Sequence, residues 1–205
     1  MEISQQEARE SLGQVEQAVQ RTRKMLAYGG ADTLFIVWGV IWVLGFLGNH
    51  FSPIVKLGNY VGPVFAQWLW IILIAAGIVI SVVVEKRRMP VKSPLGKRIG
   101  WFWGLLYVYV SLWIGLCHPF MKVQGHAQSM MLYRHFGAIA ATVPMFAYVV
   151  MGLWLDHFMI WIGLAVTALT LLGLFLLPAY FWLWMAITGG GTLMGTGIFI
   201  RNRWR

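Results

Sequence analysis

The chain has 205 residues, of which 59% are apolar and only 11% are charged, and its formal net charge is +9. Soluble domains carry about 25% charged residues, so this composition excludes an ordinary soluble domain and indicates a membrane protein. The basic residues flank the apolar runs, which predicts a role in membrane topology and argues against nucleic acid as a partner. The single cysteine, Cys117, excludes an intrachain disulfide.

The first predicted unit, residues 1–31, is a cytoplasmic amphipathic helix. Ser4 and Glu7 fit a capping box at its start, and Gly29-Gly30 marks its end. Small and apolar residues recur at a mean spacing of about 3.5 positions, as they do in a coiled coil. They are Ala8, Leu12, Val15, Val19, Thr22 and Leu26.

This stripe predicts that the N-terminal helix contacts a cytoplasmic protein partner through Leu12, Val15 and Val19. The helix would then be a docking helix or a short coiled coil. The same pattern also fits a helix that lies on the membrane surface or on the protein's own inner loops. The sequence leaves these readings open.

The second predicted unit, residues 32–205, is an all-α transmembrane domain of six helices. Residues 157–200 contain no charged side chain, and this run is long enough for two spans with a turn at Pro178. Similar charge-free runs recur along the chain. The six expected spans are 34–51, 68–84, 99–117, 135–155, 158–177 and 179–200. A faint repeat, in which Trp68-Leu69-Trp70 matches Trp182-Leu183-Trp184, suggests three helical hairpins.

The distribution of Lys and Arg predicts the orientation of these spans. Of the 16 basic residues, 13 lie before residue 32, between residues 85 and 98, or after residue 200. A six-span topology places all three segments on one side of the membrane. The positive-inside rule assigns that side to the cytoplasm, so both termini are expected there.

Within residues 32–205, the acidic side chains Asp32, Glu85 and Asp156 all lie at predicted cytoplasmic ends of the spans. Asp32 is placed to cap the first span, and Asp156-His157 marks a tight turn between the fourth and fifth spans. The expected spans have no charged side chain near their centres. This argues against a proton pump that relays protons through buried carboxylates, and we expect no catalytic residue.

The predicted outer loop after the third span is rich in possible ligands for a soft metal. Imidazole, thiol and thioether groups suit copper, and histidine pairs can hold haem. The candidate ligands are His50, Cys117, His118, Met121, His126 and His135, with Met130 and Met131 nearby. Their spacing matches no regular ligand motif, so an ordinary turn at the membrane surface is the alternative.

The last span contains Gly191 and Gly195, four residues apart. This spacing of small residues permits close helix contact, so we expect both glycines to be packing positions within the chain or in a homo-oligomer. The alternative is a broken helix that lines a substrate path.

The start of the chain resembles small polytopic bacterial integral-membrane proteins, which pair a polar N-terminal helix with a first span rich in Trp and Gly. The resemblance covers about a quarter of the chain and rests on Glu7-Ala8-Arg9, Gly29-Gly30-Ala31, Trp38-Gly39 and Trp42-Val43-Leu44-Gly45-Phe46-Leu47. It implies a bacterial inner membrane, and it supplies no activity, cofactor or site residue.

The sequence therefore predicts a non-enzymatic, multi-pass membrane protein with an accessory or regulatory role. It would lie in the lipid bilayer, act through a cytoplasmic protein partner and need no cofactor. One alternative is a small permease or channel built around the glycine-rich last span. A second is a redox protein that binds copper or haem at the outer face.

Overall fold

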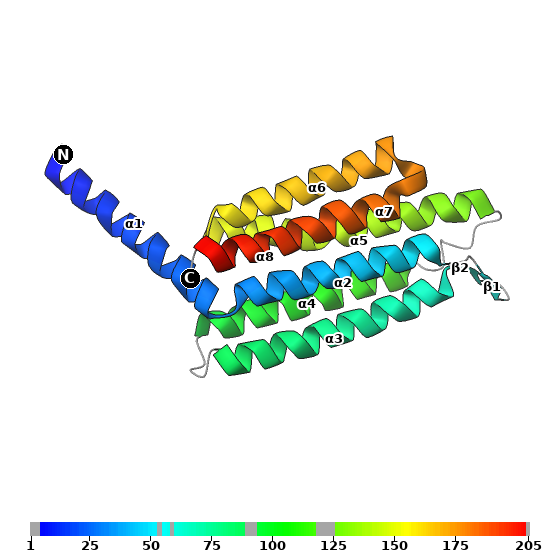
Figure 1. Cartoon of the computed structure of the whole chain (residues 1–205), viewed down its shortest axis with the longest axis horizontal. Coiled ribbons are helices and arrows are strands. Elements are labelled where there is room, and N and C mark those ends of the chain that lie inside the picture. The colour runs from blue at the N-terminus through cyan, green and yellow to red at the C-terminus, as the bar shows by residue number, and fades with distance from the viewer. Residues whose placement is uncertain (1–4, 53–54, 58–59, 89–93, 118–125, 204–205) are drawn as a thin grey trace.

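The chain folds into a bundle of long helices from which one N-terminal helix projects (Figure 1). The computed structural model describes residues 5–52, 55–57, 60–88, 94–117 and 126–203. The described elements follow one another in chain order. They are α1 (Gln5–Tyr28), α2 (Ala31–Phe51), β1 (Val55–Leu57), β2 (Tyr60–Gly62), α3 (Val64–Arg88), α4 (Pro94–Cys117), α5 (His126–Trp154), α6 (Phe158–Leu176), η2 (Pro178–Tyr180), α7 (Phe181–Met185), η3 (Ala186–Gly190) and α8 (Gly191–Arg203).

Within the part of the chain that the structure describes, five helical segments are long and apolar enough to cross a membrane. They are α2, α3, the Met130–Trp154 part of α5, α6, and the composite segment Pro178–Arg203. The helical, membrane-compatible character expected from the sequence is therefore confirmed. The 24-residue helix α4 lies alongside α3 and α2 in Figure 1 and is not among the five, but the side chains of its residues 113–117 lie outside the described part. A two-stranded antiparallel ribbon, β1 and β2, connects α2 to α3.

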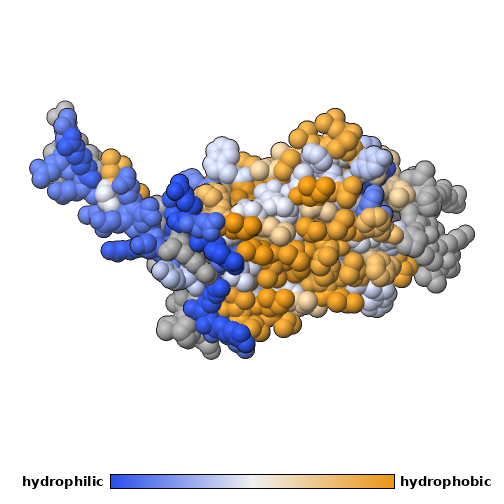
Figure 2. All heavy atoms as spheres, viewed as in Figure 1, coloured by the Kyte–Doolittle hydropathy of each residue, from blue (hydrophilic) through white to orange (hydrophobic). Residues whose placement is uncertain are grey.

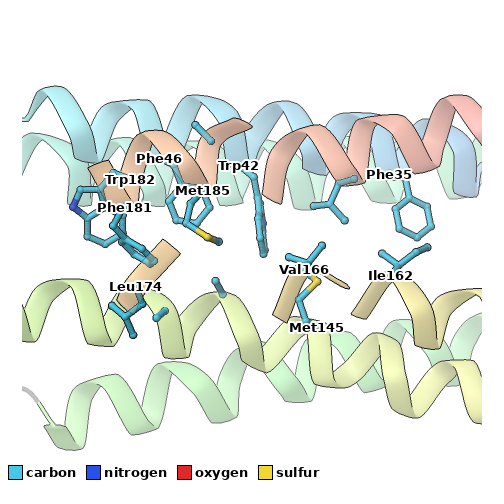
Figure 3. Packing of buried hydrophobic residues seen from close by; sticks show 14 of the residues in the cluster. Phe35, Trp42, Phe46, Met145, Ile162, Val166, Leu174, Phe181, Trp182 and Met185 are labelled. Carbon is cyan, nitrogen blue, oxygen red and sulfur yellow. The ribbon is translucent and has the colours of Figure 1, made fainter. Parts of the chain in front are cut away.

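The centre of the bundle is filled by large apolar side chains, as Figure 3 shows for several of them. Helix α2 contributes Trp42 and Phe46, and it packs against α8, η3 and α7. From the other side, Met145 on α5 and Val166 on α6 complete the core. Met185, Met145 and Val166 have almost no exposed surface, so the described part of the core is densely packed.

The first and last spans approach each other closely, and glycines make this possible. A Cβ atom on Gly39 of α2 would lie 2.9 Å from the Gly190 carbonyl oxygen. A Cβ atom on Gly197 of α8 would lie 2.6 Å from the Asp32 carbonyl oxygen. Backbone atoms cannot move aside as a flexible side chain can, so these positions require glycine.

The predicted packing positions Gly191 and Gly195 are not at this contact. Both are exposed, and a Cβ atom at either would meet no atom of the described residues within 4 Å. The expectation that they pack against a neighbouring span of the same chain is therefore wrong for the described residues. Their outward position leaves the predicted role in a homo-oligomer untested.

The last span is interrupted where the sequence is rich in glycine. Pro178 begins a short 3₁₀ turn, as the sequence predicts for the end of α6, and η3 is a π-helical turn. Such turns insert an extra residue and shift the faces of a helix. Here the shift buries Gly189 and Gly190 against Trp42 and Val43 of α2. In the described structure these glycines serve helix packing.

Helices α3 and α4 lie at the side of the bundle. Trp38 of α2 donates a hydrogen bond from Nε1 to Ser81 Oγ of α3 at 3.3 Å, and its ring stacks on Tyr107 of α4 at 5.9 Å. Most other large side chains of α3, including Ile72 and Val79, are exposed. This apolar surface suits contact with lipid chains, as expected for a helix at the edge of a membrane bundle.

Candidate functional site at the charged end of the bundle

One end of the bundle carries a buried ion-pair cluster, and we refer to it as the charged end. The Asp32 side chain is fully buried at the start of α2. Its Oδ1 accepts from Arg88 Nη1 at 3.0 Å, and its Oδ2 accepts from Arg201 Nε at 3.1 Å. The cluster therefore joins the start of α2 to the ends of α3 and α8.

The predicted role of Asp32 as a helix cap is wrong. The N-cap of α2 is Gly30, and no side chain caps it. The sequence shows an acidic residue at the right place for a cap. It gives no sign that two arginines, 56 and 169 residues away along the chain, lie close enough to pair with it.

The connection between α1 and α2 depends on Gly30. Its φ is 95°, a left-handed conformation that residues with a side chain rarely adopt. A Cβ atom there would also lie 2.7 Å from Val84 Cγ1 and 3.1 Å from Arg88 Cδ. The direction in which α1 leaves the bundle is thus fixed beside the Asp32 cluster.

A second ion pair connects α1 to the turn between α5 and α6. Arg23 Nε donates to Asp156 Oδ2 at 2.6 Å, and the backbone N–H of Phe158 donates to Asp156 Oδ1 at 2.9 Å. The tight turn predicted at Asp156-His157 is confirmed. Its contact with Arg23 was not predicted, because the two residues are 133 positions apart in sequence.

The surroundings of this pair favour its ionised form. Burial alone would raise the pKa of the Asp156 carboxyl. The hydrogen bonds from Arg23 and the Phe158 N–H, together with the charges of Arg23 and His157, outweigh burial and hold that pKa below its ordinary value. The bond to Asp156 likewise raises the pKa of Arg23, against the opposing effect of burial.

On the N-terminal side of Arg23, α1 extends away from the bundle, as the blue helix in Figure 1 shows. In Figure 2 its surface is mainly hydrophilic, with a few apolar residues. Leu12 is 64% exposed and Val15 is 60% exposed. Val19 lies in α1, but its side chain is outside the described part of the structure. The predicted partner-contact stripe is thus accessible at the two positions that can be described.

A cavity of about 440 Å³ lies where α1 meets the turn between α5 and α6. We call it the junction cavity. It is lined by Arg23, by residues 152–158 and by Trp161. Its walls combine charged groups with exposed aromatic side chains, since Trp154 is 84% exposed and Trp161 is 71% exposed.

The opposite end of the bundle is held by neutral hydrogen bonds. Asn49 Oδ1 of α2 accepts from Trp70 Nε1 of α3 at 3.1 Å and from the Tyr133 hydroxyl of α5 at 2.9 Å. This network places the end of α2 beside the starts of α3 and α5. It lies near the predicted outer metal ligands but uses none of them.

The structure does not assemble the predicted metal site from the residues that it describes. No group of three or more His, Cys, Asp or Glu is close enough to hold a metal ion within this set. The His50 ring meets the Phe51 ring edge to face at 4.9 Å, and His135 Nδ1 lies 2.8 Å from the Met131 carbonyl oxygen. His118 and Met121, and the side chains of Cys117 and His126, lie outside the described part, so the copper or haem site stays a prediction.

No protein-family model, curated protein or solved structure matches the chain.

Proposed function

We propose that the protein is a non-enzymatic accessory or regulatory membrane protein whose helix α1 docks a cytoplasmic protein partner. One observation carries this proposal. Helix α1 is fixed to the bundle at its base, yet it presents Leu12 and Val15 outside the bundle with most of their surface exposed. An exposed apolar stripe on a polar helix is a common form of partner contact.

The packing of the bundle supports this reading over the permease alternative. A transporter site is typically formed at the membrane midplane by interrupted helices around a cavity. Here the interrupted last span buries Gly189 and Gly190 against α2, and the neighbouring Met185 is completely buried. Within the described residues, the glycine-rich segment therefore supports a role in helix packing over a role in lining a substrate path.

The proposed topology has six spans, with both termini in the cytoplasm. The Asp32 cluster places the end of α3 at the charged end, whereas the Asn49 network places the start of α5 at the opposite end. The chain between them must run the length of the bundle, and the 24 residues of α4 would cover about 36 Å. This supports α4 as the sixth span.

The bacterial inner membrane and the arrangement of the spans in three hairpins remain predictions of the sequence.

The docking proposal is tested by co-purification from membranes in a mild detergent. We expect a variant with Leu12→Ser, Val15→Ser and Val19→Ser to reach normal membrane levels and to lose its cytoplasmic partner. The matched control is Gln14→Ser with Gln17→Ser, which changes exposed positions of α1 outside the stripe. If both variants retain the same co-purifying proteins, the docking role is wrong and α1 is a membrane-surface helix.

A further inference from the structure

The junction cavity has features that neither the fold nor the docking proposal explains. It is lined by the guanidinium-bearing side chain of Arg23 and by His157, and Trp154 and Trp161 lie at its rim. Its volume of about 440 Å³ is within the range of about 300–1,000 Å³ that is typical of small-molecule sites.

The aromatic rim places this cavity at a membrane surface. Trp154 ends the candidate span of α5, and Trp161 lies in the first turn of α6. Tryptophan side chains at span ends favour the headgroup layer, where the indole ring contacts apolar chains and its N–H remains in a polar region. If a ligand entered the cavity from the bilayer, its apolar part would contact the Trp154 and Trp161 rings.

The polar wall offers little to a cationic ligand. Arg23 and Asp156 balance each other in charge, and both Asp156 oxygens already accept hydrogen bonds. The carboxylate therefore has little capacity left for a cationic ligand. Among the residues that line the cavity, the other titratable side chain is that of His157, which is exposed.

Further positive charge lies close by. Phe199 of α8 stacks on Phe158 at 5.2 Å, and Phe158 lines the cavity. Arg203 follows Phe199 by four residues, one helical turn, so it lies on the same face of α8 towards the charged end. Arg203 is exposed, so α8 carries a further positive charge on the face that Phe199 turns to the cavity wall.

We propose that the junction cavity binds the phosphate headgroup of an anionic membrane phospholipid. The headgroup occupies the cavity next to Arg23 and His157, and its acyl chains lie along Trp161 in the bilayer. Charge-assisted hydrogen bonds to a phosphate are among the stronger polar interactions in proteins. This site does not depend on the docking role of α1, and it holds for either orientation in the membrane.

The test uses the purified full chain in a neutral detergent and three probes. They are dihexanoyl phosphatidylglycerol, dihexanoyl phosphatidylcholine and inorganic phosphate, and bound molecules are counted by native mass spectrometry during titration. We expect one saturable site for phosphatidylglycerol and at least about tenfold weaker binding of the other two probes. Equal binding of the two lipids, or inorganic phosphate bound as tightly as the lipid, would overturn the proposal.

Two variants locate the site. His157→Glu places a negative charge in the cavity. An acidic residue is favourable at the start of α6, but this one also repels the neighbouring Asp156 carboxylate, so folding is checked by thermal unfolding. We expect this variant to weaken phosphatidylglycerol binding at least about tenfold. Lys86→Glu, at an exposed position of α3, is the control and should bind the lipid as the parent does.

Trp161→Ala removes an exposed ring and should also weaken lipid binding, which provides a test if His157→Glu does not fold. Parent-like binding by folded His157→Glu or Trp161→Ala contradicts the proposal.

Discussion

Asp32 and Asp156 are buried carboxylates, and each is neutralised by arginine from a distant part of the chain. A buried charge is tolerated only when it is paired and hydrogen-bonded, so each residue specifies which segments must meet. The sequence predicted the location of both residues at the ends of spans. It could not predict their arginine partners, because pairing across the bundle depends on which helices are neighbours in space.

Replacing Asp32 should destabilise the bundle. In Asp32→Asn, Arg88 and Arg201 lose a common anionic partner while remaining close together. Breaking a fully buried pair typically costs about 3–5 kcal/mol, but both arginines are partly exposed, so we expect about 1–3 kcal/mol. Thermal unfolding in detergent measures the effect. The control Glu85→Gln removes an exposed acid near the same end and should be neutral, and equal stability of the two variants would refute the role of the cluster.

The ion pair between Arg23 and Asp156 should hold α1 in a pH-dependent manner. The pKa of Asp156 is lowered in the folded protein, so its stabilising effect is complete above the ordinary aspartate pKa of about 3.9 and is lost as the pH falls through the lower folded value. We expect hydrogen exchange in the last turns of α1 to be slow between about pH 5 and 7. Asp156→Asn should make it fast at neutral pH. Equal exchange in variant and parent at pH 7 would show that the pair does not hold α1.

At the scale of elements, the glycines show what spacing can and cannot predict. Gly191 and Gly195 have the spacing expected for close helix packing, but spacing does not reveal which face of a helix is turned inward. The π-helical turn η3 just before them changes the register of the last span. The face that meets α2 instead carries Gly190 and Gly197, which are seven residues, or two turns, apart.

Alanine substitutions in α8 should therefore have opposite effects at two neighbouring glycines. Gly197→Ala places a methyl group 2.6 Å from a backbone oxygen of α2, and overpacking of this kind costs about 1–3 kcal/mol. Gly195→Ala places it in open space, so we expect no loss, or a gain of up to about 1 kcal/mol from better helix propensity. Thermal unfolding of both variants checks the difference. A destabilised Gly195→Ala would instead indicate that this face meets a second copy of the chain.

For the whole molecule, the positions of the long helices could be predicted, because a charge-free apolar run of about 20 residues has the length of a membrane-spanning helix. The structure extends several of them beyond the predicted ends, as in α3, which continues through Arg88. Which helices are neighbours in the bundle could not be predicted, since nothing in the apolar pattern indicates that α2 lies against α8. That contact depends on the shapes of individual faces, which Gly39 and Gly197 determine.

The proposed six-span topology predicts where each end of the bundle faces. Reporter fusions after Leu95 and after Arg205 should both report the cytoplasm, and a fusion after Gln124 should report the opposite side. The physical reason is the concentration of 13 of the 16 basic residues in three segments that a six-span chain places together. The fusion after Gln124 decides whether α4 crosses the membrane. If the fusions after Leu95 and after Gln124 both report the cytoplasm, α4 does not cross the membrane. The chain would then have five spans, and the three arginines of the C-terminal segment would face outward.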